Sequence, residues 1–249
     1  QNSLAGAVNI LTTFPSESVQ FSLGAEYGNF DQVRLSANAS GALAENIRGR
    51  VSLRHYQRDG DIQNFVFTGP TSVTSNEDIR ERSTTALSGK LIIDASNTTE
   101  IALSGRYQTD DRTPTTGLLL GDPDFPRNAL GPLPDNTIDA GGASLKVTHD
   151  FGGVQLTSIT GFDAYEFAFS ADITDGFIAS AGSGAPPFVF APEIALRTID
   201  EESTQWRQEV RLDGATNNLV WEIGASALLR DIESTTGQSS PVLPSGDFL

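Results

Sequence analysis

The residues most capable of catalysis are few. The chain has two histidines, His55 and His149, and no cysteine. His149 beside Asp150 has the order of a base and its orienting carboxylate, but no nucleophile pattern lies near it and a tight turn follows. We interpret His149 as a turn residue and His55 as a ring on the outward face of its strand. The two histidines lack metal-ligand spacing, so the sequence predicts no enzyme, no metal site and no cofactor.

Two other groups of residues suit ligand binding. Gly121-Asp122-Pro123-Asp124 has carboxylates for a calcium ion, although Asp and Pro are also common turn residues, which is the interpretation we favour. A later linking segment is rich in phenylalanine, and an aromatic loop could grip a planar ligand or pack against neighbouring loops. Its candidate ligand-side aromatics are Phe167, Phe169, Phe177, Phe188 and Phe190.

The elements that position these residues follow from a hydrophobic period of two. Apolar residues alternate with polar ones at 51–54, 101–106 and 144–148, and most extensively at 219–229. Such alternation is typical of strands with one apolar and one wet face. Tight polar links near residues 45, 97, 152 and 216 alternate with long links at 58–82, 109–139, 166–201 and beyond 231. Short turns on one side and long loops on the other indicate an outer-membrane barrel.

Charge is distributed in agreement with such a barrel. The net charge of −16 argues against a nucleic-acid partner. The long links are acidic, whereas many basic residues fall on the polar side of the strands, which we expect to face the lumen because a lipid-facing charge costs about 2–4 kcal/mol at mid-membrane. The lumen-facing candidates are Arg34, Arg50, Arg54, Arg106, Lys146, Arg207 and Arg211. They suit either plug carboxylates, which we favour, or an anionic cargo.

Five short segments, in order, resemble TonB-dependent outer-membrane receptors of the siderophore-receptor type. The stretch Gly6-Ala7-Val8-Asn9-Ile10 resembles the end of their plug domain. Four later segments resemble their barrel strands and turns: Tyr27–Asp31, Arg58–Ile62, Thr157–Phe162 and Gln208–Leu212.

The resemblance implies an all-β, transmembrane antiparallel β-barrel, of which this chain is an open fragment with about nine of an expected 22 strands. Residues 1–15 would be the C-terminal tail of the plug and residues 16–249 the N-terminal part of the barrel.

The implied function is TonB-dependent uptake of a scarce nutrient, a ferric siderophore above all, across a Gram-negative outer membrane. The implied partners are the TonB–ExbB–ExbD complex (through a missing N-terminal region), outer-membrane lipid, lipopolysaccharide and the cargo. A passive porin or an adhesive barrel without energy coupling is the alternative. A soluble secreted β-protein would share the alternation but would not require detergent.

Overall fold

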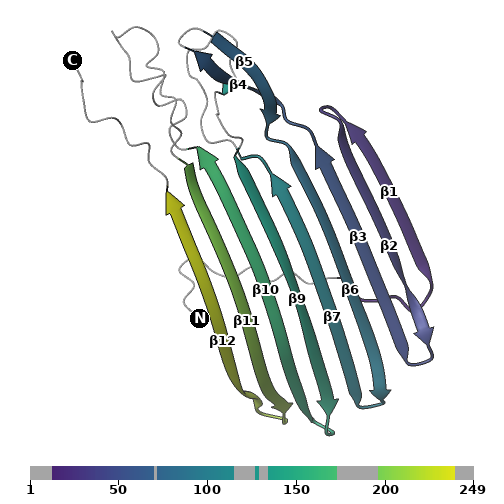
Figure 1. The fold of residues 1–249 in the computed structure, drawn as a ribbon. Helices are drawn as coiled ribbons and strands as arrows, with labels where there is room; N and C mark the ends of the chain where they lie inside the picture. Colours follow the sequence, from purple (N-terminus) through teal and green to yellow (C-terminus); the bar gives the residue numbers. More distant parts are fainter. Residues whose placement is uncertain (1–12, 70–71, 115–126, 129–133, 173–195, 239–249) are drawn as a thin grey trace.

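The computed structural model describes residues 13–69, 72–114, 127–128, 134–172 and 196–238. Nine long strands form one antiparallel sheet in the order β1-β2-β3-β6-β7-β9-β10-β11-β12 (Figure 1). Their bounds are β1 Gln20–Gly28, β2 Gln32–Ala44, β3 Ile47–Arg58, β6 Arg82–Ser96, β7 Thr99–Arg112, β9 Asp135–Asp150, β10 Val154–Asp172, β11 Leu196–Ala215 and β12 Val220–Gln238. The prediction of about nine antiparallel strands in an open sheet is confirmed.

The long strands pair in registers that are continuous apart from irregularities beside two tight turns, at Ala42/Ala44 and at Asp94/Ser96. Elsewhere residues two apart share a face across the sheet. One face is apolar, and its side chains are exposed: Leu23, Ile223 and Leu229 are 71%, 65% and 73% exposed. A water-soluble monomer rarely exposes so extensive an apolar surface. The predicted alternation is confirmed around Leu103 and Leu145. The residues two positions before and two positions after each of them lie on the same apolar face.

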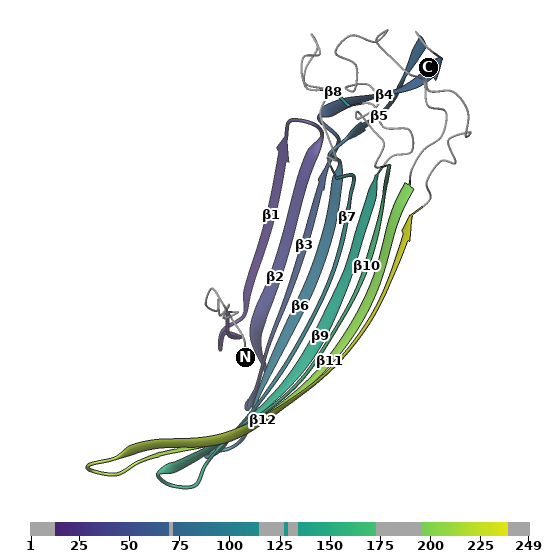
Figure 2. The same cartoon turned by 90° about the vertical axis from the view of Figure 1, so that its left-hand side faces the viewer.

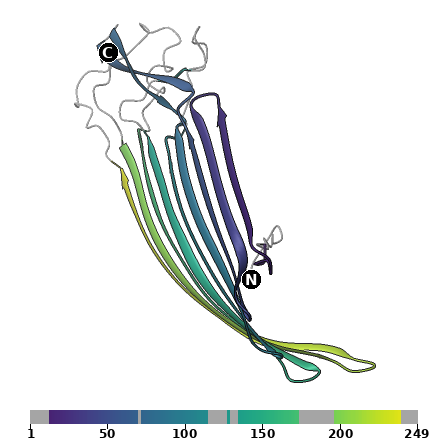
Figure 3. The same ribbon diagram turned by 90° about the vertical axis from the view of Figure 1, so that its right-hand side faces the viewer.

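The sheet is curved along its strands (Figures 2 and 3). The residues that lead into β1 lie on its concave side. Their side chains contact polar-face residues such as Lys90. The polar face is therefore the concave face, and the apolar face is the convex one. No helix among the described residues is long and apolar enough to cross a membrane.

The long links contain more strand than the sequence predicts. A second sheet, in the order β5-β4-β8, is built from β4 Ile62–Gly69, β5 Ser72–Ile79 and β8 Arg127–Asn128. It stands at the long-loop end of the main sheet (Figure 1). Part of the segment from residue 58 to 82 is thus a hairpin. Polar residues interrupt the alternation in this segment, and a hairpin that lies outside the main sheet tolerates them.

The base of this hairpin is fixed by backbone and charge contacts. The Asp61 carboxylate forms ion pairs with Arg58 and Arg80, and the Asp61 amide donates to the Ile79 carbonyl at 3.1 Å. The Arg58 guanidinium lies 5.1 Å from the centre of the Phe30 ring. The first turn, the end of β3 and the hairpin are therefore held as one unit.

Candidate functional site on the polar concave wall

The concave wall holds all the basic residues of the nine long strands. The register places the seven predicted lumen-facing residues, Arg34, Arg50, Arg54, Arg106, Lys146, Arg207 and Arg211, on this one face. Lys90, Arg48 and Arg230 share it. The opposite face is apolar, so the charged side chains gather on the wall, where they lie among other polar groups.

Some of these cations are already neutralised by wall carboxylates. Arg34 pairs with Glu26 at 2.8 Å, and Arg211 pairs with Asp213 at 3.1 Å and with Glu222 at 3.5 Å. The wall is therefore mixed in charge rather than uniformly basic. Sequence alternation identifies the shared face but not the pairs Arg34–Glu26 and Arg211–Glu222, because these join different strands and depend on strand register.

Other cations of the wall have no carboxylate within ion-pair distance among the described residues. They include Arg50, Arg54, Lys146 and Arg207. The Arg207 guanidinium lies flat above Gly161, where an added Cβ would sit 3.2 Å from its nitrogen. These four side chains are free to bind an anionic group brought into the concavity.

One ion pair crosses a whole strand. Arg106 of β7 reaches Asp163 of β10 at 2.7 Å, and Gly142 of β9 is the register partner of both. A Cβ at Gly142 would collide with the Asp163 carboxylate and would sit 2.9 Å from the Phe162 carbonyl oxygen. Glycine is required at this position because the pair occupies the space above it.

The segment ahead of β1 lies against the same wall. The Nζ atom of Lys90 is 4.5 Å from the centre of the Phe14 ring. The Ser16 amide donates to the Ser40 hydroxyl at 2.8 Å, and the Ala42 amide donates to the Glu17 carbonyl at 3.3 Å. Ser40 is only 7% exposed as a result. The chain thus reaches β1 from inside the concavity, a contact that alternation alone does not reveal.

The candidate loop aromatics require a correction. Phe167 and Phe169 lie in strand β10, opposite Glu201 and Ile199, and not in a loop. The strand continues past Glu166 because alternation continues to Asp172 beyond the acidic residues that suggested a link. Phe177, Phe188, Phe190 and the stretch Gly121–Asp124 lie outside the described residues.

The aromatic residues near the strand ends divide between the two faces. Tyr107 and Phe162 lie on the convex face, and Phe162 packs against Trp206 with ring centres 4.8 Å apart. Tyr56 and Tyr165 are on the concave face. Each side chain instead meets a polar residue of the wall, Gln32 for Tyr56 and Glu201 for Tyr165.

The two histidines act as strand residues in local contacts. A His55 ring nitrogen lies 2.9 Å from the Thr85 hydroxyl. A His149 ring nitrogen lies 2.7 Å from the Thr99 hydroxyl, and its ring packs edge-on against Phe151. Within the described residues no group of three or more His, Cys, Asp and Glu is placed to hold a metal ion.

Asp150 closes the tight turn between β9 and β10. Its carboxylate accepts hydrogen bonds from the amides of Gly152 at 2.7 Å and Gly153 at 3.3 Å, and these bonds lower its pKa below the ordinary value of 3.8. A depressed folded-state pKa gives stability that is complete above the unfolded pKa and is lost as pH falls through the folded pKa.

We therefore expect the turn to weaken in acid. In denaturant titrations at a series of pH values, the native protein should lose stability below about pH 4. Asp150→Asn, which keeps an acceptor oxygen but cannot titrate, should show a smaller acid-induced loss than the native chain. Equal losses in both proteins would contradict the assignment.

Four carboxylates stand side by side on the convex face at its long-loop end. The register pairs Asp139 with Glu166, Glu166 with Glu202, and Glu202 with Glu233. Within the described part of the chain, only Asp139 of the four accepts a hydrogen bond from a side chain, the Tyr107 hydroxyl at 2.7 Å. Like charges directly opposite each other destabilise a sheet.

Neutralising the middle of this row is expected to stabilise the sheet. Glu202→Gln should raise the free energy of unfolding by up to about 1 kcal/mol at low salt, and the gain should shrink with added salt because exposed charges are screened. The matched control is Glu209→Gln, whose carboxylate lies 3.9 Å from Arg211 on the other face. A gain in stability of the same size in the control would contradict repulsion among the four carboxylates.

The geometry defines the chain as an open, curved antiparallel sheet with one polar and one apolar face. Solved siderophore-receptor structures share its fold. The ferric yersiniabactin uptake receptor FyuA of Yersinia pestis matches with a TM-score of 0.72 at 14% identity over 92% of this chain. The siderophore receptor PiuA of Acinetobacter baumannii matches with 0.64 at 12% over 90%. The ferripyoverdine receptor of the Pseudomonas aeruginosa outer membrane, bound to ferripyoverdine, matches with 0.64 at 18% over 90%.

The chain spans about a third of the length of these proteins, 33%, 32% and 29% respectively. No protein-family model and no curated protein sequence matches it. The resemblance stated from sequence is thus confirmed at the level of the fold.

Proposed function

We propose that the chain is part of an outer-membrane transporter of a Gram-negative bacterium that takes up a scarce nutrient by TonB-dependent transport. The observation that carries the proposal is the segment 13–18 lying against the concave wall. A chain that reaches its first strand from inside the concavity suits a barrel filled by an N-terminal plug. It does not suit a passive porin, whose lumen is an open water channel.

In this proposal residues 1–15 are the tail of the plug and residues 16–249 the first part of the barrel. The unpaired cations of the wall, Arg50, Arg54, Lys146 and Arg207, bind carboxylates of the plug and hold it inside the barrel. The TonB–ExbB–ExbD complex acts on the plug through a region upstream of this chain. Plug rearrangement then opens a path along the polar wall.

A ferric siderophore is the cargo that we infer. FyuA, PiuA and the ferripyoverdine receptor are siderophore receptors by name, and they share the fold of this chain. The loops, including the hairpin fixed by Asp61, would capture the cargo on the outer side. Lipopolysaccharide and phospholipid would surround the convex face.

Iron uptake by whole cells tests this function. Cells expressing the full-length protein should accumulate radioactive iron from a supplied ferric siderophore, and an uncoupler of the proton gradient should abolish the accumulation. Uptake that persists after uncoupling would indicate a passive porin. If no siderophore of a panel were taken up while the protein was intact in the membrane, the inference that the cargo is a siderophore would be overturned.

A further inference from the structure

The convex face is not uniformly flat. A groove of about 720 Å³ runs across β1, β2, β3, β6 and β7. Its walls are large apolar side chains, Phe21, Leu43, Val51, Leu91 and Leu103, and its floor includes four glycines, Gly41, Gly49, Gly89 and Gly105. Its volume lies within the range of about 300–1,000 Å³ typical of small-molecule sites.

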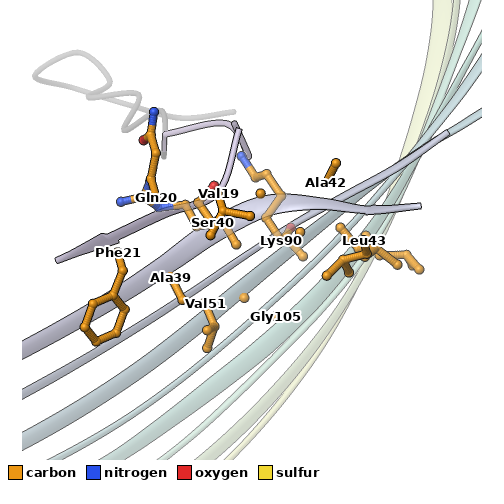
Figure 4. A pocket seen from close by; sticks show the side chains of 17 residues that line it. Val19, Gln20, Phe21, Ala39, Ser40, Ala42, Leu43, Val51, Lys90 and Gly105 are labelled. Carbon is orange, nitrogen blue, oxygen red and sulfur yellow. The ribbon is translucent and has the colours of Figure 1, made fainter. Parts of the chain in front are cut away.

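The groove opens away from the polar wall. Figure 4 shows Phe21, Ala39 and Val51 on one side of the sheet and Gln20 and Lys90 on the other. The register agrees, because Phe21, Ala39, Val51, Gly89 and Gly105 share the convex face. The charged and hydroxyl residues among those that line the groove, Ser40, Arg50, Lys90 and Ser104, lie on the concave face by register, so the groove itself is lined by hydrocarbon.

At two of the floor glycines, no contact with a described residue requires the absence of a side chain. Gly89 and Gly105 are direct cross-strand partners. A Cβ at Gly89 would meet only the Arg50 carbonyl at 3.8 Å, and one at Gly105 only the Gly142 carbonyl at 3.9 Å, which are ordinary contacts. By contrast, a Cβ at Gly49 would sit 2.8 Å from Leu43.

Glycine within a strand is destabilising by roughly 0.5–1 kcal/mol relative to alanine. Gly89 and Gly105, which no contact in the described ranges requires to be glycine, keep a space open on the outer side. The space lies at the middle of β6 and β7, and the groove extends from there toward the tight turns near residues 45 and 97. In an outer-membrane barrel the tight turns are periplasmic.

We propose that this groove holds one acyl chain of a phospholipid of the periplasmic leaflet. The inference rests on the proposed placement of the chain in the outer membrane. The groove is continuous with the exposed apolar face, so hydrocarbon is the solvent that reaches it. An acyl chain fits because its binding requires no polar partner, and a chain lying between two walls makes more dispersion contacts than one lying on a flat surface.

Photo-crosslinking tests the groove. The full-length protein is reconstituted in vesicles of phosphatidylethanolamine that carry a diazirine on one acyl chain, and crosslinked peptides are identified by mass spectrometry. We expect several-fold more label on peptides containing Leu91 and Leu103 than on the convex residues of β12 around Ala227. The variants Gly89→Leu and Gly105→Leu should remove this excess, because a leucine at either position occupies the floor of the groove.

Both variants should fold, since a Cβ at either glycine has room. Ala227→Leu is the matched control, a small-to-large change on the same face outside the groove, and it should leave the label on β6 and β7 unchanged. Equal labelling of the groove and of β12 in the native protein would overturn the groove while leaving the membrane barrel intact. Absence of label from the whole convex face would overturn the barrel itself.

Discussion

Ala225→Arg is expected to destabilise the membrane-inserted protein by about 2–4 kcal/mol if residue 225 lies near the bilayer middle. Ala225 is on the convex face of β12, opposite Val210. An arginine there must either enter hydrocarbon or distort the sheet to reach water. Reversible unfolding of the full-length protein in lipid vesicles, followed by tryptophan fluorescence, measures the change in free energy.

The neighbouring residue supplies the control. Ser226 lies at nearly the same depth but faces the concave wall, opposite Glu209. Ser226→Arg places its charge beside a carboxylate and water, so we expect a change within about 1 kcal/mol. If both variants lost equal stability, the assignment of convex and concave faces would be wrong.

Gly142→Val is the second change with a large expected effect. The valine side chain would occupy the space in which Arg106 meets Asp163 and would press on the Phe162 carbonyl. Overpacking of this kind typically costs about 1–3 kcal/mol. The ion pair is partly exposed and adds little to that figure, because exposed pairs contribute at most about 1 kcal/mol.

Gly105→Val distinguishes this steric effect from a general intolerance of side chains at strand glycines. A Cβ at Gly105 makes only an ordinary contact at 3.9 Å, and valine favours strands. We expect Gly105→Val to be neutral or stabilising in the same unfolding assay. Comparable losses in both variants would show that the Arg106–Asp163 bridge is not what requires Gly142.

The strand pattern was predictable because it depends on local sequence. Alternation assigns Leu103 and Arg106 to opposite faces, and the tight link at Gly152 places a turn, whatever the rest of the chain does. The same local logic placed the seven lumen-facing candidates on one face. The same logic also predicted the end of a strand too early, before Phe167, because an acidic residue inside a long strand looks like the start of a loop.

The contacts between strands were not predictable from one sequence. The Arg106–Asp163 bridge depends on two successive registers, and residues 106 and 163 are separated by a long link. The contact of Phe14 with Lys90 joins a segment before the barrel to its fourth strand in sheet order. Such pairings are set by tertiary geometry, which a period of two does not encode.

The most direct test of the account is a disulfide between the segment ahead of β1 and the concave wall. The Ser16 and Ser40 hydroxyl oxygens are 2.9 Å apart, and the chain has no native cysteine to interfere. In the full-length protein in outer membranes, Ser16→Cys with Ser40→Cys should form a disulfide under mild oxidation. Ser16→Cys with Ala39→Cys, on the convex face, should not. Crosslinking to residue 39, or to neither, would contradict a plug-filled barrel.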